Sequence, residues 1–94
     1  MKETFSSCNL LISAPIIPSG VTSLSSTFSG CKSLTGTIII NTNNITTTSH
    51  GASEGSCYGC FSGVNMNNIT LTGEASKETL NLIGSTGNNW TPIE

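Results

Sequence analysis

The sequence predicts an α/β repeat fold in which a short helical turn and a short strand alternate along a stacked chain. Two observations carry this prediction: residues 1–73 repeat themselves at an offset of 23 residues, and their apolar side chains fall in fixed columns of the repeat. A third observation is the change of pattern after residue 73, where we expect the repeat to end in a C-terminal cap. With 94 residues, the chain is at most one domain with a modest core.

The repeat is visible when the N-terminal residues are aligned with those that follow. Residues 4–17 match residues 27–40 at seven of fourteen positions, and a less regular third copy centres on Phe61. The aligned columns hold phenylalanine, then cysteine or valine, then leucine in the first two copies. The predicted structural core is therefore Phe5, Phe28, Phe61, Cys8, Cys31, Val64, Leu11 and Leu34.

Each unit is predicted to contain a helical turn followed by a strand. Val21, Leu24 and Phe28 are spaced i, i+3 and i+7, as on one face of a helix, and residues 38–40 are a β-branched run typical of a strand. Such a unit cannot bury its apolar side alone. Stacked copies are therefore expected to place Phe over Phe.

The residues of the second copy resemble a known family. Val-Thr-Ser-Leu at 21–24, followed by Thr-Phe-Ser-Gly-Cys-Lys-Ser-Leu-Thr at 27–35, is similar to the leucine-rich repeat of the BspA type. The resemblance covers residues 1–73, with two units matched well and a third in degraded form. It implies a leucine-rich-repeat solenoid of about three units of about 23 residues, in which the Phe, Cys and Leu columns are structural.

The same resemblance implies a function. Proteins of this type are mostly surface proteins of bacteria, so the expected role is a non-catalytic recognition or adhesion module of a bacterial or phage surface protein. The implied partner is a host or cell-surface protein or glycan, and the implied location is extracellular or at the cell surface. The alternatives are a purely structural repeat spacer within a larger protein, and a small thiol or zinc module.

Residues 41–56 interrupt the repeat. This insert is rich in Asn, Thr, Ser and Gly, and Ile45 and Ala52 are its only apolar residues. We predict a surface loop, which is either a mobile segment without a ligand or a contact loop.

Residues 74–94 are predicted to form the C-terminal cap. Leu80 and Ile83 have helical spacing and Gly84 stands where a helix C-cap is expected, although the alternation of Leu80 with Leu82 fits a strand equally well. Trp90 is expected to cover the last unit.

Composition excludes two classes of partner. The chain has three lysines, no arginine and a net charge of −2, so it lacks the basic stripe that a nucleic-acid binder needs. It has no apolar run of the length of a membrane-spanning helix and no segment with the pattern of a signal peptide, so no membrane insertion is expected.

Cys57 and Cys60 form the one pattern with a metal or redox reading. A zinc site needs four ligands and a redox pair needs a helix N-terminus after a strand, and neither context is complete here. Core packing is the favoured interpretation, with a disulfide or thiol chemistry as alternatives. We predict no enzyme activity, no catalytic residue, no metal ligand and no cofactor.

Two residues are candidates for contact with a ligand: Tyr58, an aromatic side chain that we expect to be exposed, and His50, the sole histidine, which lies in the insert. A recognition module should gather exposed aromatic side chains on its strand-bearing face, whereas a spacer should present only Ser, Thr and Asn there. Because Met1 aligns with the middle of a repeat, we also expect a fragment of a larger protein, or self-association through open solenoid ends.

Overall fold

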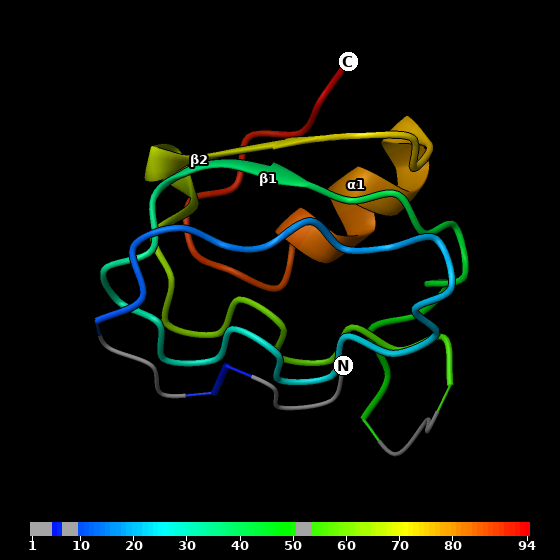
Figure 1. Cartoon of the computed structure of the whole chain (residues 1–94), viewed down its shortest axis with the longest axis horizontal. Helices are drawn as coiled ribbons and strands as arrows, with labels where there is room; N and C mark the ends of the chain where they lie inside the picture. Colours follow the sequence, from blue (N-terminus) through cyan, green and yellow to red (C-terminus); the bar gives the residue numbers. More distant parts are fainter. Residues whose placement is uncertain (1–4, 7–9, 51–53) are drawn as a thin grey trace.

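The computed structural model describes residues 5–6, 10–50 and 54–94. Within them, the regular elements are strand β1 (Gly36–Ile39), the 3₁₀-helix η1 (Met66–Asn68), strand β2 (Ile69–Thr72) and helix α1 (Lys77–Gly84) (Figure 1). The other described residues form turns and irregular segments, several of which lie side by side in parallel.

The two strands form a parallel sheet in which Thr37 lies opposite Thr70 and Ile38 opposite Leu71. Because successive side chains of a strand point to opposite faces, Ile38 and Leu71 enter the core while both threonines are exposed. The N-terminal segment continues this pairing through one isolated parallel bridge, between Ile17 and Ile40.

A second parallel ladder joins the turns at the opposite edge of the molecule. Residues 24–30 run alongside residues 56–62 below the sheet in Figure 1, and alternate N–H groups of the first segment donate to the second. These hydrogen bonds are 2.8–2.9 Å long and join the N–H groups of Leu24, Ser26, Phe28 and Gly30 to the carbonyl oxygens of Ser56, Tyr58, Cys60 and Ser62.

Three phenylalanine rings stack across these turns. The ring centroids of Phe5 and Phe28 are 5.5 Å apart with an interplanar angle of 6°, and those of Phe28 and Phe61 are 5.4 Å apart with an angle of 8°. Phe28 and Phe61 are buried, whereas Phe5 is half-buried because it lies at the end of the stack.

The predicted fold class, an α/β leucine-rich-repeat solenoid of about three strand-plus-helix units, is wrong. The described residues contain two four-residue strands and one short helix, and the helix lies outside the part of the chain expected to repeat. The molecule is a small globule, mostly coil, with extents of 28 × 27 × 21 Å and a radius of gyration of 11.4 Å.

The predicted helical turns do not form, because alternate backbone N–H groups of residues 24–30 donate to residues 56–62 rather than within their own segment. An α-helix needs each N–H to bond the carbonyl four residues earlier, but the N–H groups of Leu24, Ser26 and Phe28 bond the neighbouring segment instead. Ser26 and Gly30 also have positive φ angles, 54° and 76°, which interrupt a helix. The i, i+3, i+7 spacing of Val21, Leu24 and Phe28 therefore arises from consecutive turns and not from a helix.

The first predicted strand fails because of proline. Residues 13–16 align with β1, but Pro15 among them and Pro18 just after them lack the N–H that a strand donates to its ladder. Only Ile17 pairs with the sheet, donating to Ile39 and accepting from Asn41 at 2.8 and 2.9 Å.

The insert is held more firmly than an exposed loop. Thr42 and Ile45 are buried, and the Thr42 hydroxyl donates to the carbonyl oxygen of Val21 at 2.6 Å. The Asn44 amide donates to the carbonyl oxygens of Ser19 and Val21, both at 3.2 Å. The first part of the insert is thus another layer against residues 17–22.

A helix is confirmed in the C-terminal region. Ser76 is the N-cap of α1, its hydroxyl accepting from the N–H of Thr79 at 3.2 Å, and Leu80 and Ile83 are buried. Gly84 is the last helical residue, and the C-cap is Ser85. A side chain at residue 84 would overlap the ring of Trp90, which explains the glycine.

Candidate functional site

The residues predicted for the core lie largely inside the molecule. Cys31, Leu34 and Val64 are buried with the inner phenylalanines, and Leu11 is half-buried against the same cluster. Cys8 lies outside the described residues. The cluster also takes in β1, β2 and α1, so the predicted repeat region and cap share one core.

The three described thiols are buried. Cys31, Cys57 and Cys60 are each 0% exposed. Burial raises the pKa of Cys57 from 9.0 to about 11, although a backbone hydrogen bond opposes the shift, and burial raises the pKa of Cys60 well above its ordinary value. A reactive or metal-binding cysteine needs a thiolate. Among the described residues, no group of three or more His, Cys, Asp or Glu could hold a metal ion.

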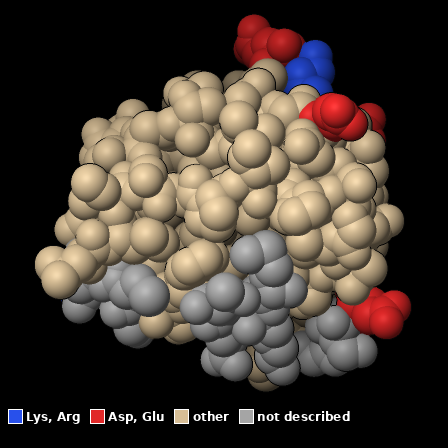
Figure 2. Space-filling model, in the orientation of Figure 1, with Lys and Arg blue, Asp and Glu red and all other residues tan. Residues whose placement is uncertain are grey.

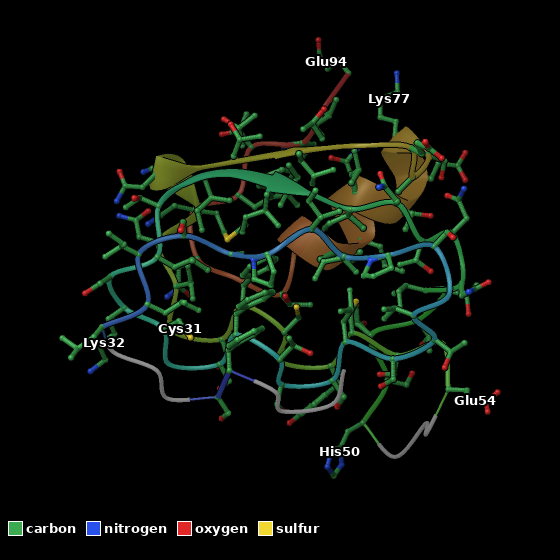
Figure 3. All side chains as sticks on the ribbon, viewed as in Figure 1. Cys31, Lys32, His50, Glu54, Lys77 and Glu94 are labelled. Carbon is green, nitrogen blue, oxygen red and sulfur yellow. The ribbon has the colours of Figure 1, made fainter. Side chains whose placement is uncertain are left out.

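The structure brings the two ligand candidates together. The rings of His50 and Tyr58 lie 4.5 Å apart between centroids and are tilted by 51°. Both residues are exposed, Tyr58 by 40%, and Figure 3 shows His50 projecting from the molecule at the end farthest from the strands. They form a small aromatic surface, here called the His50–Tyr58 pair.

Hydrogen bonds on both sides of the pair hold its backbone. Thr47 and Ser56 form a parallel bridge, and the Ser56 hydroxyl donates to the carbonyl oxygen of Ser49 at 3.0 Å. The same hydroxyl accepts from the N–H of Tyr58 at 3.1 Å. One buried serine thus connects the residue before His50 with Tyr58.

The strand-bearing face carries no exposed aromatic side chain among the described residues. Thr37 and Ile39 of β1 and Thr70 and Thr72 of β2 are exposed there. The His50–Tyr58 pair lies near the parallel ladder between residues 24–30 and 56–62. It does not lie on the strand-bearing face, where a recognition module was expected to gather its aromatic side chains.

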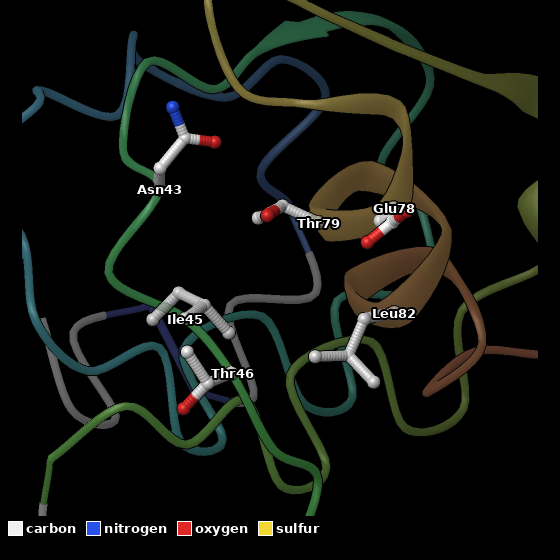
Figure 4. Close-up of a pocket in the computed structure, with 6 residues that line it drawn as sticks. All are labelled: Asn43, Ile45, Thr46, Glu78, Thr79 and Leu82. Carbon is white, nitrogen blue, oxygen red and sulfur yellow. The ribbon is translucent and has the colours of Figure 1, made fainter.

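A pocket of about 350 Å³ lies between the insert and α1 (Figure 4). One wall comes from the insert and the other from the first two turns of the helix; the lining residues are Asn43, Ile45, Thr46, Glu78, Thr79 and Leu82. The sequence did not reveal this pocket, because it exists only where the insert packs against the helix. The one available signal was Ile45, an apolar residue in an otherwise polar segment.

Charged groups are sparse on the face shown in Figure 2, where they lie at the margin and leave the centre without charge. No helix among the described residues is long and apolar enough to cross a membrane. Comparison of the chain with protein-family models, with curated proteins and with solved structures finds no match.

Proposed function

We propose that this protein is a non-catalytic recognition module that binds a neutral glycan at the His50–Tyr58 pair. The single observation that carries the proposal is the contact between the two rings, 4.5 Å apart and open to solvent. Tyr and His each offer an apolar ring and a polar tip, the combination that suits a ligand with both C–H and hydroxyl groups. The proposal does not depend on a repeat fold.

The surroundings of the pair favour an uncharged ligand. The neighbouring exposed side chains Thr48 and Ser49 are hydroxyl-bearing, and Glu54 is the nearest carboxylate in sequence. A polysaccharide or cell-surface glycan has the hydroxyl groups to match such a surface. An extracellular or cell-surface location, on a bacterium or phage, belongs to this proposal.

The buried thiols argue against the thiol or zinc alternative. Their raised pKa values keep Cys57 and Cys60 protonated at neutral pH, whereas both metal binding and nucleophilic attack require the thiolate.

The test is a titration of ¹⁵N- and ¹³C-labelled protein with the methyl glycosides of glucose, galactose and N-acetylglucosamine, followed by NMR. Binding should shift the ring signals of His50 and Tyr58, with dissociation constants of about 1–10 mM for single sugars. Tyr58→Ala should abolish the shifts, and the matched variant Tyr58→Phe, which keeps the ring, should retain most of the affinity. Equal shifts in Tyr58→Ala, or none with any sugar, would contradict the proposal.

A structural role in a larger assembly is the second candidate, favoured by the exposed aliphatic side chains of the N-terminal segment. Leu10, Ile12 and Ile16 are 92%, 66% and 57% exposed. Exposed apolar side chains that form one contiguous patch commonly mark contact surfaces. The discriminating measurement is the oligomeric state of the chain as a function of concentration.

A further inference from the structure

We propose that the pocket between the insert and α1 binds an alkylammonium group, such as the end of a lysine side chain. This site is separate from the His50–Tyr58 pair, and it shares no residue with that pair. Four observations lead to the proposal: a pocket of suitable size, walls that are tied to each other, an aliphatic part of the lining and a single carboxyl side chain.

The two walls of the pocket are tied to one another by side-chain amides of the insert. The carbonyl oxygen of the Asn43 amide accepts from the N–H of Ser76 at 2.8 Å, and that of Asn41 accepts from the N–H of Glu74 at 2.9 Å. Both bonds span 33 residues and end just before α1 begins. The pocket is therefore largely pre-formed, which lowers the entropic cost of binding.

The lining of the pocket is partly polar and partly aliphatic. The aliphatic part comes mainly from Leu82, which is half-buried, and from the edge of Ile45, which is 2% exposed (Figure 4). A volume of about 350 Å³ lies at the small end of the range of ligand pockets and suits a short aliphatic chain. Lysine and related amines bury their methylene stems against surfaces of this kind.

The polar groups of the pocket select a donor with positive charge. Among the described residues, Glu78 is the only ionisable one in the lining, and a carboxylate accepts hydrogen bonds but donates none. The hydroxyl oxygen of Thr79, which accepts from the Ser76 hydroxyl at 3.0 Å, is a further acceptor in the lining. An ammonium group has three donors and no acceptor, so it complements this set, whereas a carboxylate or phosphate would be repelled by Glu78.

No lysine of the described part of the chain belongs to the pocket lining. Lys77 is next to Glu78 in sequence, but Figure 3 shows its side chain projecting away from the body of the molecule. The net charge of the chain, −2, adds a weak attraction for cations.

The test is an NMR titration of the labelled protein with three probes of equal length: 1-aminobutane, 1-butanol and butyrate. We expect 1-aminobutane to shift the backbone amide signals of the pocket residues with a dissociation constant of about 1–10 mM. Butanol should bind at least about fivefold more weakly and butyrate not measurably, because only the ammonium pairs with Glu78. Raising the NaCl concentration from about 20 mM to about 500 mM should weaken aminobutane binding severalfold.

Matched variants isolate the carboxylate. Glu78→Gln keeps the size of the side chain on an exposed helix position and should reduce aminobutane affinity about fivefold, to the level of butanol. Glu74→Gln removes an equal charge that does not line the pocket and should leave affinity within about twofold. Far-ultraviolet circular dichroism will verify that both variants fold.

A lysine with blocked backbone ends, N-acetyl-lysine N-methylamide, separates the two sources of an alkylammonium group. Tighter binding than aminobutane identifies the lysine side chain of a polypeptide, and equal binding identifies a free amine. Equal affinity for aminobutane and butanol, or an unchanged affinity in Glu78→Gln, would overturn the proposal. None of these readouts involves the His50–Tyr58 pair, so the glycan proposal can fail without affecting this one.

Discussion

The two ends of the parallel layers differ in how they meet solvent. At the N-terminal edge, Leu10, Ile12 and Ile16 are exposed and Phe5 covers only one side of Phe28. At the other end, α1 and the residues after it cover the core, and Trp90 packs over Gly84. The edge of a set of parallel segments leaves backbone N–H and C=O groups without a partner segment. At the C-terminal end of the molecule, side chains of α1 cover the core in place of a further parallel segment.

The largest effect should come from the middle of the phenylalanine stack. Phe28 is buried with a ring on each side, so Phe28→Ala should lower the free energy of unfolding by about 3–5 kcal/mol. Phe5 has only one ring neighbour among the described rings and is half-buried, so Phe5→Ala should cost about 1–2 kcal/mol. Urea unfolding followed by circular dichroism measures both, and equal losses would mean that the open edge is as tightly packed as the centre.

The next largest loss of stability is expected from a substitution of Gly84, at the end of the molecule that α1 covers. A Cβ there would overlap the Trp90 ring, so Gly84→Ala should displace the ring and cost about 1–3 kcal/mol. Gly20 is the matched control, since nothing lies within 4 Å of its added Cβ. Gly20→Ala should change the free energy of unfolding by less than about 0.5 kcal/mol. Trp90 fluorescence reports the displacement directly. An unchanged spectrum in Gly84→Ala would contradict the close packing of the Trp90 ring on residue 84.

The buried thiols predict a loss of stability at alkaline pH. The pKa of Cys57 is about 11 in the folded protein against an ordinary value of 9.0, and the pKa of Cys60 is raised in the same direction. The unfolded chain therefore releases these protons first, and the free energy of unfolding should be independent of them below pH 9 and fall as the pH rises toward 11.

Urea midpoints measured at neutral pH and across that alkaline range will test this. Cys57→Ala should have a shallower decline than the parent chain, because one of the contributing thiols is gone. A decline of the same slope in both proteins would show that other groups cause the pH dependence.

Apolar spacing alone predicted several features at the level of single residues. The Phe28 and Phe61 rings, 33 residues apart in sequence, lie in contact, and Leu80 and Ile83 lie on a helix, although the spacing there also fitted a strand. Such positions follow from which side chains avoid water. Spacing could not tell where backbone N–H groups point, and the sideways bonds of residues 24–30 are the reason that turns replace the expected helices.

The candidate sites were harder to anticipate, because they depend on contacts between distant segments. The His50–Tyr58 contact requires the bridge between Thr47 and Ser56, and the pocket requires Asn43 to accept from Ser76. An asparagine in an Asn- and Thr-rich tract has no sequence mark that distinguishes a structural partner from a solvated side chain. The insert therefore resembled a linker, although Thr42 is fully buried.

The open edge should affect association more than stability. If Ile12 and Ile16 form a contact surface, sedimentation velocity of the parent chain should show a weight-average mass that rises between about 10 µM and about 1 mM. Ile16→Lys should hold the chain monomeric and change the free energy of unfolding by less than about 0.5 kcal/mol. Thr70→Lys, an exposed position on β2, is the control and should leave association unchanged. A parent chain that stays monomeric at the highest concentration would remove the self-association hypothesis.

The smallest effect is expected at the closed end, from the indole N–H of Trp90. This group is buried without a hydrogen-bond partner among the described residues, so its desolvation opposes the packing that the ring provides. Trp90→Phe removes the donor but also part of the ring area, two changes of opposite sign. We expect the free energy of unfolding to change by less than about 1 kcal/mol, whereas Trp90→Ala, which removes the whole cover from Gly84, should lose about 2–3 kcal/mol. If Trp90→Phe is as destabilising as Trp90→Ala, the N–H has a partner in solution, and closure of this end depends on a polar contact as well as on packing.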